Sequence, residues 1–206
     1  MVKHAIVTRM TYRDKDKLRK RLPFTQQYLV ESLRNQTDQR FEWVIVVMPG
    51  DEEFIRKALD YPCTPIPHPI RSPHGTTPIH RYLVDGHYRI QTRVDSDDWL
   101  SPDCVSMLKK KCAQYTTKYP RFLMHLQPMK YNHFTHQLYS MSTYKAPAVS
   151  SFLTLCQRVP DCHVLSYPHH QMHQLTHNMV MIGPGYARYV MHDSNDSLKK
   201  YQRKAS

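Results

Sequence analysis

A continuous apolar run, Trp43–Met48, is followed directly by the turn formers Pro49 and Gly50. Because the run lacks the polar alternation of a half-exposed strand, it predicts a parallel strand buried on both faces. Asp51 follows, and two glutamates after it predict the first turn of a helix. A sheet built around such a strand needs helices on both faces, so the chain is expected to form a layered α/β structure.

The first 118 residues repeat this order of strand and helix, which is typical of a mostly parallel sheet. Thr11–Pro23 is too charged for a core and is expected to be a loop. In the helix after Gly50, the residues expected to face inward are Phe54, Ala58 and Leu59. The expected strands are 2–7, 43–48, 63–68 and 88–94, and the expected helices are 25–36, 51–59, 77–86 and one that Ser101 caps.

The second half has a different pattern of short apolar segments joined by polar turns. No internal repeat or low-complexity linker separates the halves, so we expect one domain over 1–206. Within it, we expect two unequal halves, 1–118 and 119–206. The expected strands of this half are 122–126, 129–134, 137–141 and 164–167, and a helix is expected near 148–156.

The chain is strongly basic, with 29 Lys and Arg residues against 17 Asp and Glu and a formal net charge of +12. Such a balance favours an anionic partner, either nucleic acid, a membrane surface or a phosphorylated small molecule. Runs such as Lys15–Arg21 and Lys109–Lys111 are expected to be solvated faces. The functional candidates among the basic residues are single arginines near strand ends, namely Arg9, Arg71 and Arg93.

The five cysteines contain no CxxC pair and are odd in number, so neither a zinc ribbon nor a disulfide framework is predicted. Reduced thiols are typical of the cytoplasm. No apolar run approaches the roughly 18 residues that a membrane-spanning helix needs. We therefore expect a cytoplasmic protein or one domain of a longer multidomain chain.

The most informative motif is Asp95-Ser96-Asp97-Asp98, which directly follows the strand expected at 88–94. Three carboxylates within four residues repel each other unless a cation or full solvation compensates them. In open α/β sheets, ligands bind at the carboxyl ends of the strands. Hard oxygen ligands suit Mg²⁺ or Mn²⁺, which typically join a few carboxylates to substrate phosphates. The alternatives are an acidic turn without a ligand or a second helix cap.

The segment Arg93–Leu100 resembles the R-x-D-x-D-D-x-L form of the DxD motif in glycosyltransferases of the GT-A fold. It is most similar to the small rhamnosyltransferase-like branch, which includes enzymes encoded by large chlorella viruses. Thr8-Arg9 after the first strand, Ser32–Thr37 before Trp43, and Ser151–Leu155 before a histidine-bearing segment agree with this resemblance. It implies a three-layer, Rossmann-like domain with a mixed, mainly parallel sheet. In that domain 1–118 would bind the nucleotide-sugar and 119–206 the acceptor, and an enzyme encoded by a virus would act in the host cytoplasm.

The resemblance also implies roles for individual residues. Asp97 would bind a divalent ion, Mn²⁺ or Mg²⁺, and Asp95 would contact the ribose or share the ion. Asp98 would lie near the sugar or hold water on the ion, so Asp97 and Asp98 are the catalytic candidates. The donor, a UDP-sugar, would lie against Thr8, Arg9, Arg93 and, in a later loop, Arg71. A late histidine, His169 or His170, would complete the metal site.

The implied reaction transfers a sugar such as rhamnose or glucose to a hydroxyl of a glycan or glycoprotein. A metal ion and arginines would stabilise the charge that develops on the leaving diphosphate. Inverting enzymes also need a carboxylate base near the attacking hydroxyl. The second half lacks the Glu-Asp pair common in such enzymes, so the base is not assigned and a retaining mechanism stays open.

Three other features have alternatives. His169, His173 and His177 would share a helix face, but no neighbouring acid or cysteine completes a zinc set. The late tyrosines are either core residues or an aromatic platform for an acceptor sugar: Tyr131, Tyr139, Tyr144 and Tyr167. The positive charge would also suit a nucleic-acid-binding protein. However, the sequence contains no nucleic-acid-binding motif, and we expect no nucleic acid among the partners. A metal-dependent nucleotidyltransferase would use similar carboxylates.

Overall fold

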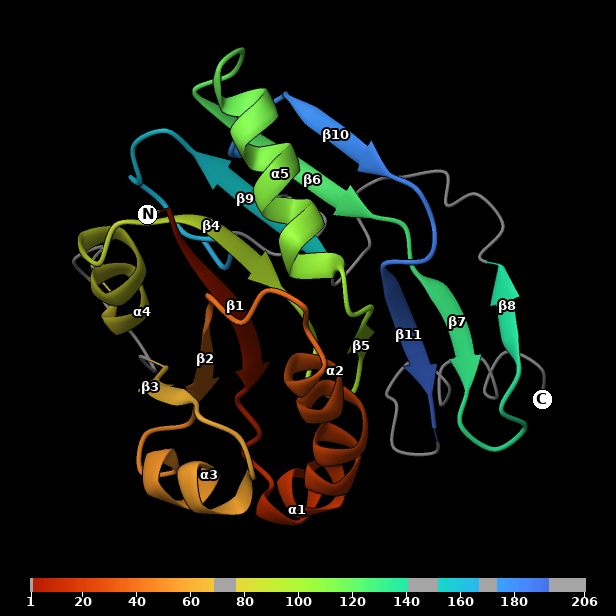
Figure 1. Cartoon of the computed structure of the whole chain (residues 1–206). Coiled ribbons are helices and arrows are strands. Elements are labelled where there is room, and N and C mark those ends of the chain that lie inside the picture. The colour runs from red at the N-terminus through yellow and green to blue at the C-terminus, as the bar shows by residue number, and fades with distance from the viewer. Residues whose placement is uncertain (1, 69–76, 141–151, 167–173, 193–206) are drawn as a thin grey trace.

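The computed structural model describes residues 2–68, 77–140, 152–166 and 174–192. Its centre is a seven-stranded sheet in the order β10-β6-β9-β4-β1-β2-β3 (Figure 1). The strands are β1 Lys3–Met10, β2 Glu42–Val47, β3 Thr64–Pro67, β4 Tyr88–Arg93, β6 Arg121–Leu126, β9 Leu153–Gln157 and β10 Met179–Ile182. The pairs from β3 through β4 are parallel, β9 is antiparallel to both neighbours, and β10 is parallel to β6.

A smaller four-stranded sheet, in the order β5-β11-β7-β8, lies beside the large one (Figure 1). Its strands are β5 Trp99–Leu100, β7 Met129–Asn132, β8 Leu138–Ser140 and β11 Ala187–Met191. β5 follows the acidic motif and pairs with β11, which comes from near the end of the described chain. The small sheet therefore brings late residues next to the end of β4.

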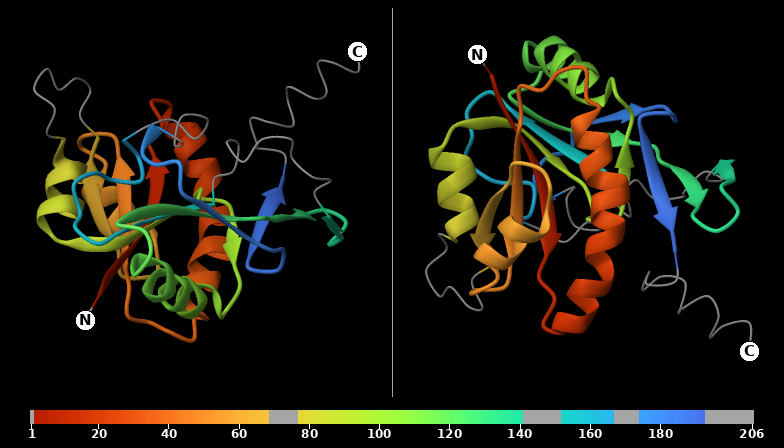
Figure 2. Two further views of the ribbon diagram at one scale, coloured as in Figure 1. Left: turned by 90° about the horizontal axis from the view of Figure 1, so that it is seen from above. Right: turned by 60° about the horizontal axis from the view of Figure 1, so that its bottom comes forward.

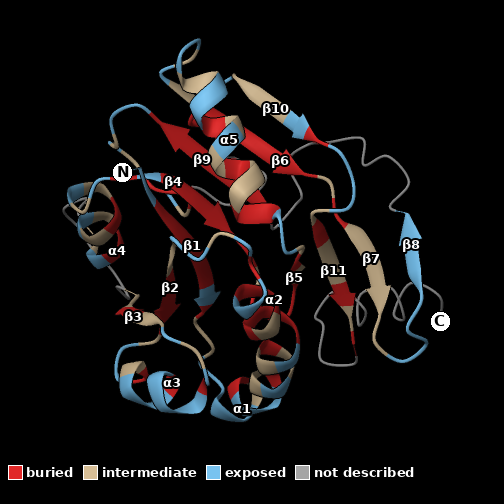
Figure 3. Cartoon of the chain, in the orientation of Figure 1, coloured by how far each residue is buried: buried red, intermediate tan, exposed pale blue. Residues whose placement is uncertain are grey.

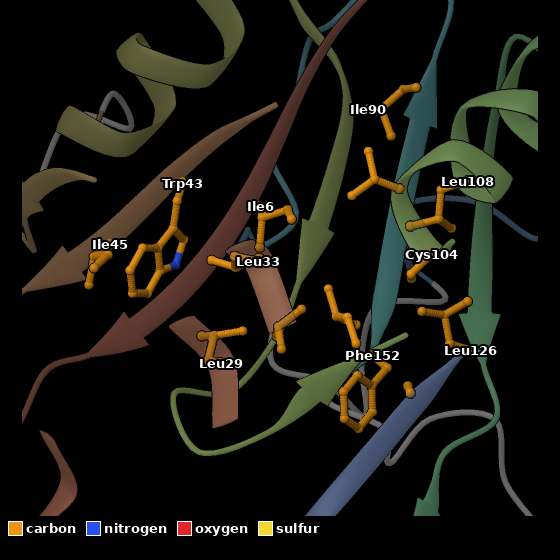
Figure 4. Close-up of a cluster of buried hydrophobic side chains, with 14 of the residues drawn as sticks. Ile6, Leu29, Leu33, Trp43, Ile45, Ile90, Cys104, Leu108, Leu126 and Phe152 are labelled. Atoms are coloured by element: carbon orange, nitrogen blue, oxygen red, sulfur yellow. The ribbon is translucent and has the colours of Figure 1, made fainter. Parts of the chain in front are cut away.

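Two apolar clusters hold the layers together. One side of the large sheet packs on α1 Lys15–Phe24, α2 Glu31–Arg34, α3 Glu52–Ala58 and α5 Cys104–Thr116. Figure 4 shows part of this cluster around Ile6, Trp43 and Phe152. The other side packs on α4 Pro78–His80 and the π-helical turn η2 Arg81–Asp85. The central strands β1, β4, β6 and β9 are buried from both sides (Figure 3), as expected for a three-layer α/β domain.

The parallel half follows the prediction closely. The strands expected from residues 2, 43, 63 and 88 are present as β1, β2, β3 and β4. Thr77 begins the next helix, because its side chain accepts a hydrogen bond from the backbone N–H of His80. In α3, however, Ile55 and not Phe54 faces the core, and Phe54 is 40% exposed. Ala58 is exposed as well, while Leu59 is buried as predicted.

The expectation of a loop over Thr11–Pro23 is wrong. A continuous helix runs from Lys15 to Arg34 through α1, the π-helical turn η1 Thr25–Val30 and α2, and Figure 2 shows it along one side of the molecule. Asp14 caps it by accepting hydrogen bonds from the backbone N–H groups of Asp16 and Lys17. The high charge misled the prediction, since a surface helix needs only a narrow apolar stripe.

Two predictions for the second half are also wrong. The helix expected near 148–156 is instead β9 from Leu153 onward, with residues 148–151 outside the described part. Every residue of β9 is buried between β4 and β6, and a short, fully buried run has the same sequence pattern in a strand or a helix. The strand expected at 164–167 is a turn through Ser166. The strands β10 and β11 were not predicted.

Candidate donor-binding site

The acidic motif lies at the carboxyl end of β4, beside the parallel strand β1. The backbone N–H of Val94 still donates to the carbonyl of Val7, at 3.1 Å, and the chain then turns away. The N–H of Asp98 closes the turn by donating to the carbonyl of Asp95, at 3.2 Å. The structure therefore places the turn Asp95–Asp98 where ligands bind in α/β sheets, as the sequence predicts.

The three carboxylates of this turn have different environments. The side chain of Asp95 is 40% exposed, whereas Asp97 and Asp98 are buried. Asp98 accepts a hydrogen bond from the backbone N–H of Val190 in β11, at 3.1 Å from its Oδ1. Asp95 thus faces solvent and Asp98 holds the small sheet. Asp97 is the buried carboxylate whose further contacts form the centre of the site.

Asp97 is bound by two side chains that are distant in sequence. Its Oδ2 lies 2.5 Å from Nη1 of Arg21 in α1 and 2.8 Å from Nε2 of His192, which directly follows β11. The side chains of Arg21 and Asp97 are only 8% and 6% exposed, and His192 is fully buried. A buried carboxylate with a guanidinium and an imidazole on one oxygen forms a strongly interacting polar centre.

Aromatic rings hold His192 in this position. Phe24, one helical turn after Arg21, stacks on the imidazole with ring centroids 3.9 Å apart and planes 14° apart. His133 packs edge-on against Phe24 at 5.3 Å. The hydroxyl of Tyr28 in η1 is hydrogen-bonded to Nδ1 of the same His133. The helix that the sequence failed to predict therefore supplies both Arg21 and the ring that orients His192.

The other predicted residues of the donor site have varied contacts. Thr8 is buried and its hydroxyl accepts a hydrogen bond from Nε1 of Trp43, at 3.0 Å. Arg9 is exposed, and its Nε donates to the hydroxyl of Thr11 at 2.8 Å. A role of Thr8 and Arg9 in donor binding stays a prediction.

Arg93 is the last residue of β4, two positions before the acidic turn begins. It is buried, and its Nη2 lies 4.0 Å from Oδ1 of Asp95. Burial lowers the pKa of the Arg93 guanidinium, while Asp95 acts in the opposite direction. Three predicted site residues, Arg71, His169 and His170, lie outside the described residues, so their roles stay predictions.

The chemistry of Asp97 and His192 fits a divalent ion. Carboxylate and imidazole groups both bind Mn²⁺, and their 2.8 Å separation is close to the distance of about 3 Å between neighbouring ligands of one octahedral ion. Among the described residues, no group of three or more His, Cys, Asp or Glu side chains is placed to hold an ion. The pair would therefore need ligands from substrate and water, as is common for Mg²⁺.

A cavity of about 470 Å³ lies at the other end of β4, away from the acidic turn. Its lining includes Arg40, Arg89, Lys109 and Arg158 around an apolar floor. Two of these cations are already paired, since both Arg40 and Lys109 contact Asp38. The length of β4 separates this cavity from Asp97, so it has no part in the site described above.

Arg21 and His192 were missed by the sequence analysis. The helix cap at Asp14 and the position of Arg21 three residues after the buried Leu18 were the available signals for a buried arginine. No comparable local signal marks His192, because only the fold brings it within reach of a residue 95 positions earlier.

The fold and the carboxylate turn together define a class of protein. A mainly parallel sheet with one antiparallel strand, and acidic residues at the carboxyl end of its central strand, form the GT-A fold of nucleotide-diphospho-sugar transferases. Residues 3–204 match the family described as "Putative rhamnosyl transferase". The chain belongs to this family.

Solved structures with this fold include residues 1–349 of TarS from S. aureus. The chain is 13% identical to TarS, with 92% of this chain and 60% of that chain covered and a TM-score of 0.52. The same part of TarS in complex with UDP-GlcNAc is also 13% identical, with 93% and 59% covered and a TM-score of 0.48. The chain thus spans about 60% of these TarS structures.

A "putative nucleotide-diphospho-sugar transferase" from Desulfovibrio desulfuricans G20 is 12% identical. The match covers 100% of this chain and 90% of that chain, with a TM-score of 0.48. A comparison with curated proteins finds no match. Within the described part of the chain, no helix is both long and apolar enough to cross a bilayer.

Proposed function

We propose that this chain is a glycosyltransferase that moves a sugar, such as rhamnose or glucose, from a UDP-sugar to a hydroxyl of a glycan. The family supports the reaction class. The observation that carries the proposal is the contact between Asp97 and His192, 2.8 Å apart at the carboxyl end of the central strand. This contact brings two ligands of different type to the sheet edge where a nucleotide is expected.

We assign Asp97 and His192 as the ligands of a divalent ion, Mn²⁺ or Mg²⁺. Asp95 is the further candidate in the same turn, because its carboxylate is partly open to solvent. His192 is the late histidine that the structure brings to Asp97, while His169 and His170 remain candidates from sequence alone. The ion, when bound, would neutralise charge that develops on the departing diphosphate.

The chain's own cations would act on the same charge. Arg93 lies beside Asp95, and Arg21 lies against Asp97, so both guanidinium groups are near the expected position of the diphosphate. Because both are buried, they need no large reorganisation when negative charge develops. Asp98 holds β11 in place through Val190, and so fixes the backbone that precedes His192.

We propose the second half as the acceptor side. Tyr139 is 42% exposed on β8, and Tyr131 on β7 bonds through its hydroxyl to Nδ1 of His136, at 2.8 Å. Aromatic rings of this kind pack well on sugar faces. Tyr144 and Tyr167 lie outside the described residues. A cytoplasmic location and a longer multidomain chain remain predictions.

A panel of nucleotide-sugars tests the function. We expect the protein, incubated with Mn²⁺ and UDP-glucose, UDP-rhamnose, UDP-GlcNAc or GDP-mannose, to release UDP faster than GDP. Release should fall at least about tenfold in EDTA and return when Mn²⁺ is added in excess. Release of nucleoside diphosphate from none of these donors, with protein that is folded by circular dichroism, would contradict the proposed function.

A further inference from the structure

We propose that Arg21 makes ion binding at Asp97 depend on the donor diphosphate. In the absence of donor, Arg21 neutralises Asp97 and so weakens binding of a divalent ion. When the diphosphate is present, its negative charge compensates Arg21, and the ion and donor bind together. This inference rests on the proposed function of the site and assigns Arg21 as a positioning residue within it.

The first support is the position of the guanidinium. Nη1 of Arg21 and Nε2 of His192 both contact the same oxygen, Oδ2 of Asp97. An ion held by Asp97 and His192 would therefore lie close to the positive charge of Arg21. Water screens this repulsion poorly, because the Arg21 and Asp97 side chains are both more than nine-tenths buried.

The charges around the turn give the second support. Arg21 pairs with Asp97, and Arg93 lies 4.0 Å from Asp95. Together with Asp98 in the same turn, these five side chains carry a single net negative charge. A divalent ion alone would make the group positive. A divalent ion together with the two negative charges of a sugar-linked diphosphate returns the group to a single net negative charge, so the ion and the donor together leave the charge of the site unchanged.

Arg21 is also fixed more firmly than its neighbours. The α1 helix is basic throughout, but Arg19 points outward with its side chain 67% exposed and pairs with Asp16. Arg21 instead packs with its guanidinium 5.7 Å from the ring centre of Tyr12, whose hydroxyl lies 3.5 Å from that of Ser96 in the acidic turn. These contacts hold the cation against the turn, so it cannot leave Asp97 without repacking.

The ion sites coordinated by one or two protein carboxylates typically rely on substrate phosphates for their remaining ligands. Two adjacent protein ligands, Asp97 and His192, fit that pattern. The neighbouring cation adds a second reason for dependence on the donor. We therefore expect the divalent ion and the donor to bind with strong positive coupling. Arg21 should determine the size of this coupling.

The test measures Mn²⁺ binding by the electron paramagnetic resonance signal of free Mn²⁺, with and without UDP. In the wild type, UDP should tighten Mn²⁺ binding at least about tenfold. Arg21→Met should bind Mn²⁺ alone about tenfold more tightly than the wild type and should lose most of the coupling. Arg19→Met, a loss of charge from the same helix, should behave as the wild type.

Arg21→Gln serves as a second uncharged variant that can still donate a hydrogen bond to Asp97, should Arg21→Met fail to fold. Unchanged Mn²⁺ affinity in folded Arg21→Met or Arg21→Gln would overturn the inference. Equal Mn²⁺ affinity of the wild type with and without UDP would also overturn it, even if the release of UDP from a donor is normal. Strong coupling without any release of UDP from donors would instead overturn the proposed reaction and leave the role of Arg21 intact.

Discussion

Asp95, Asp97 and Asp98 show how one residue type takes three roles within a four-residue turn. Asp95 is partly exposed, Asp97 bonds to side chains from two other elements, and Asp98 is buried against the backbone of β11. The sequence predicts a charged, functional turn here, and the structure separates the roles by burial. Asp98 was proposed as catalytic from the resemblance, and that role stays a prediction beside its structural contact.

At this scale we expect Asp98→Ala to destabilise the protein. The substitution leaves the buried N–H of Val190 without its acceptor, which costs about 1–3 kcal/mol. For a chain of this length the midpoint of thermal unfolding should fall by roughly 2–10 °C. Asp95→Ala is the matched control, since that carboxylate is partly exposed, and should shift the midpoint by less than about 2 °C. Equal midpoints for both variants would refute the structural role.

At the scale of elements, the site depends on the contact between the first helix and the end of β11. The helix carries Arg21 and Phe24 on one side, one turn apart, and both touch the centre formed by Asp97 and His192. The helix widens into the π-turn η1 directly after Pro23 and Phe24. Pro23 has no N–H, which disturbs the regular hydrogen bonding of the helix at this point.

This contact predicts an effect of Phe24 on ion binding. Phe24→Ala removes the ring that stacks on His192, so the imidazole loses its fixed orientation. Groups that orient a metal ligand typically contribute about 10–100-fold in affinity. We expect Mn²⁺ affinity in saturating UDP to fall about tenfold, measured by calorimetry. Phe54→Ala, at an exposed phenylalanine of α3, is the control. An unchanged affinity in Phe24→Ala would show that the stacking does not support the site.

At the scale of the whole molecule, the parallel strands of the first half and the short strands β6, β7 and β8 of the second were predictable, whereas α1, β9, β10 and β11 were not. The run Trp43–Val47 in β2 is buried on both faces, as is typical of a parallel strand between two layers of helices. In the second half, β9 lies antiparallel between β4 and β6, and its five residues have no pattern that separates strand from helix. Pairing with distant strands decides its structure, and local sequence does not contain that information.

The same distinction applies to the site. Asp95–Asp98 was predictable because the carboxyl end of a buried strand is a general binding position. Arg21 and His192 were not, since their importance comes from contacts with Asp97 across 76 and 95 residues. The basic run Lys15–Arg21 was expected to be a solvated face, and one of its members is buried in the centre of the site.

The central claim is that Asp97 links a divalent ion to the nucleotide of the donor. Calorimetric titration of UDP into the wild type and into Asp97→Ala, each in Mn²⁺ and in EDTA, tests it directly. We predict that the wild type binds UDP at least about tenfold more tightly in Mn²⁺, that Asp95→Ala retains part of this difference, and that Asp97→Ala loses it entirely. Asp16→Ala, on the exposed side of α1, should match the wild type. Equal affinity of the wild type and Asp97→Ala for UDP in Mn²⁺ would contradict the account.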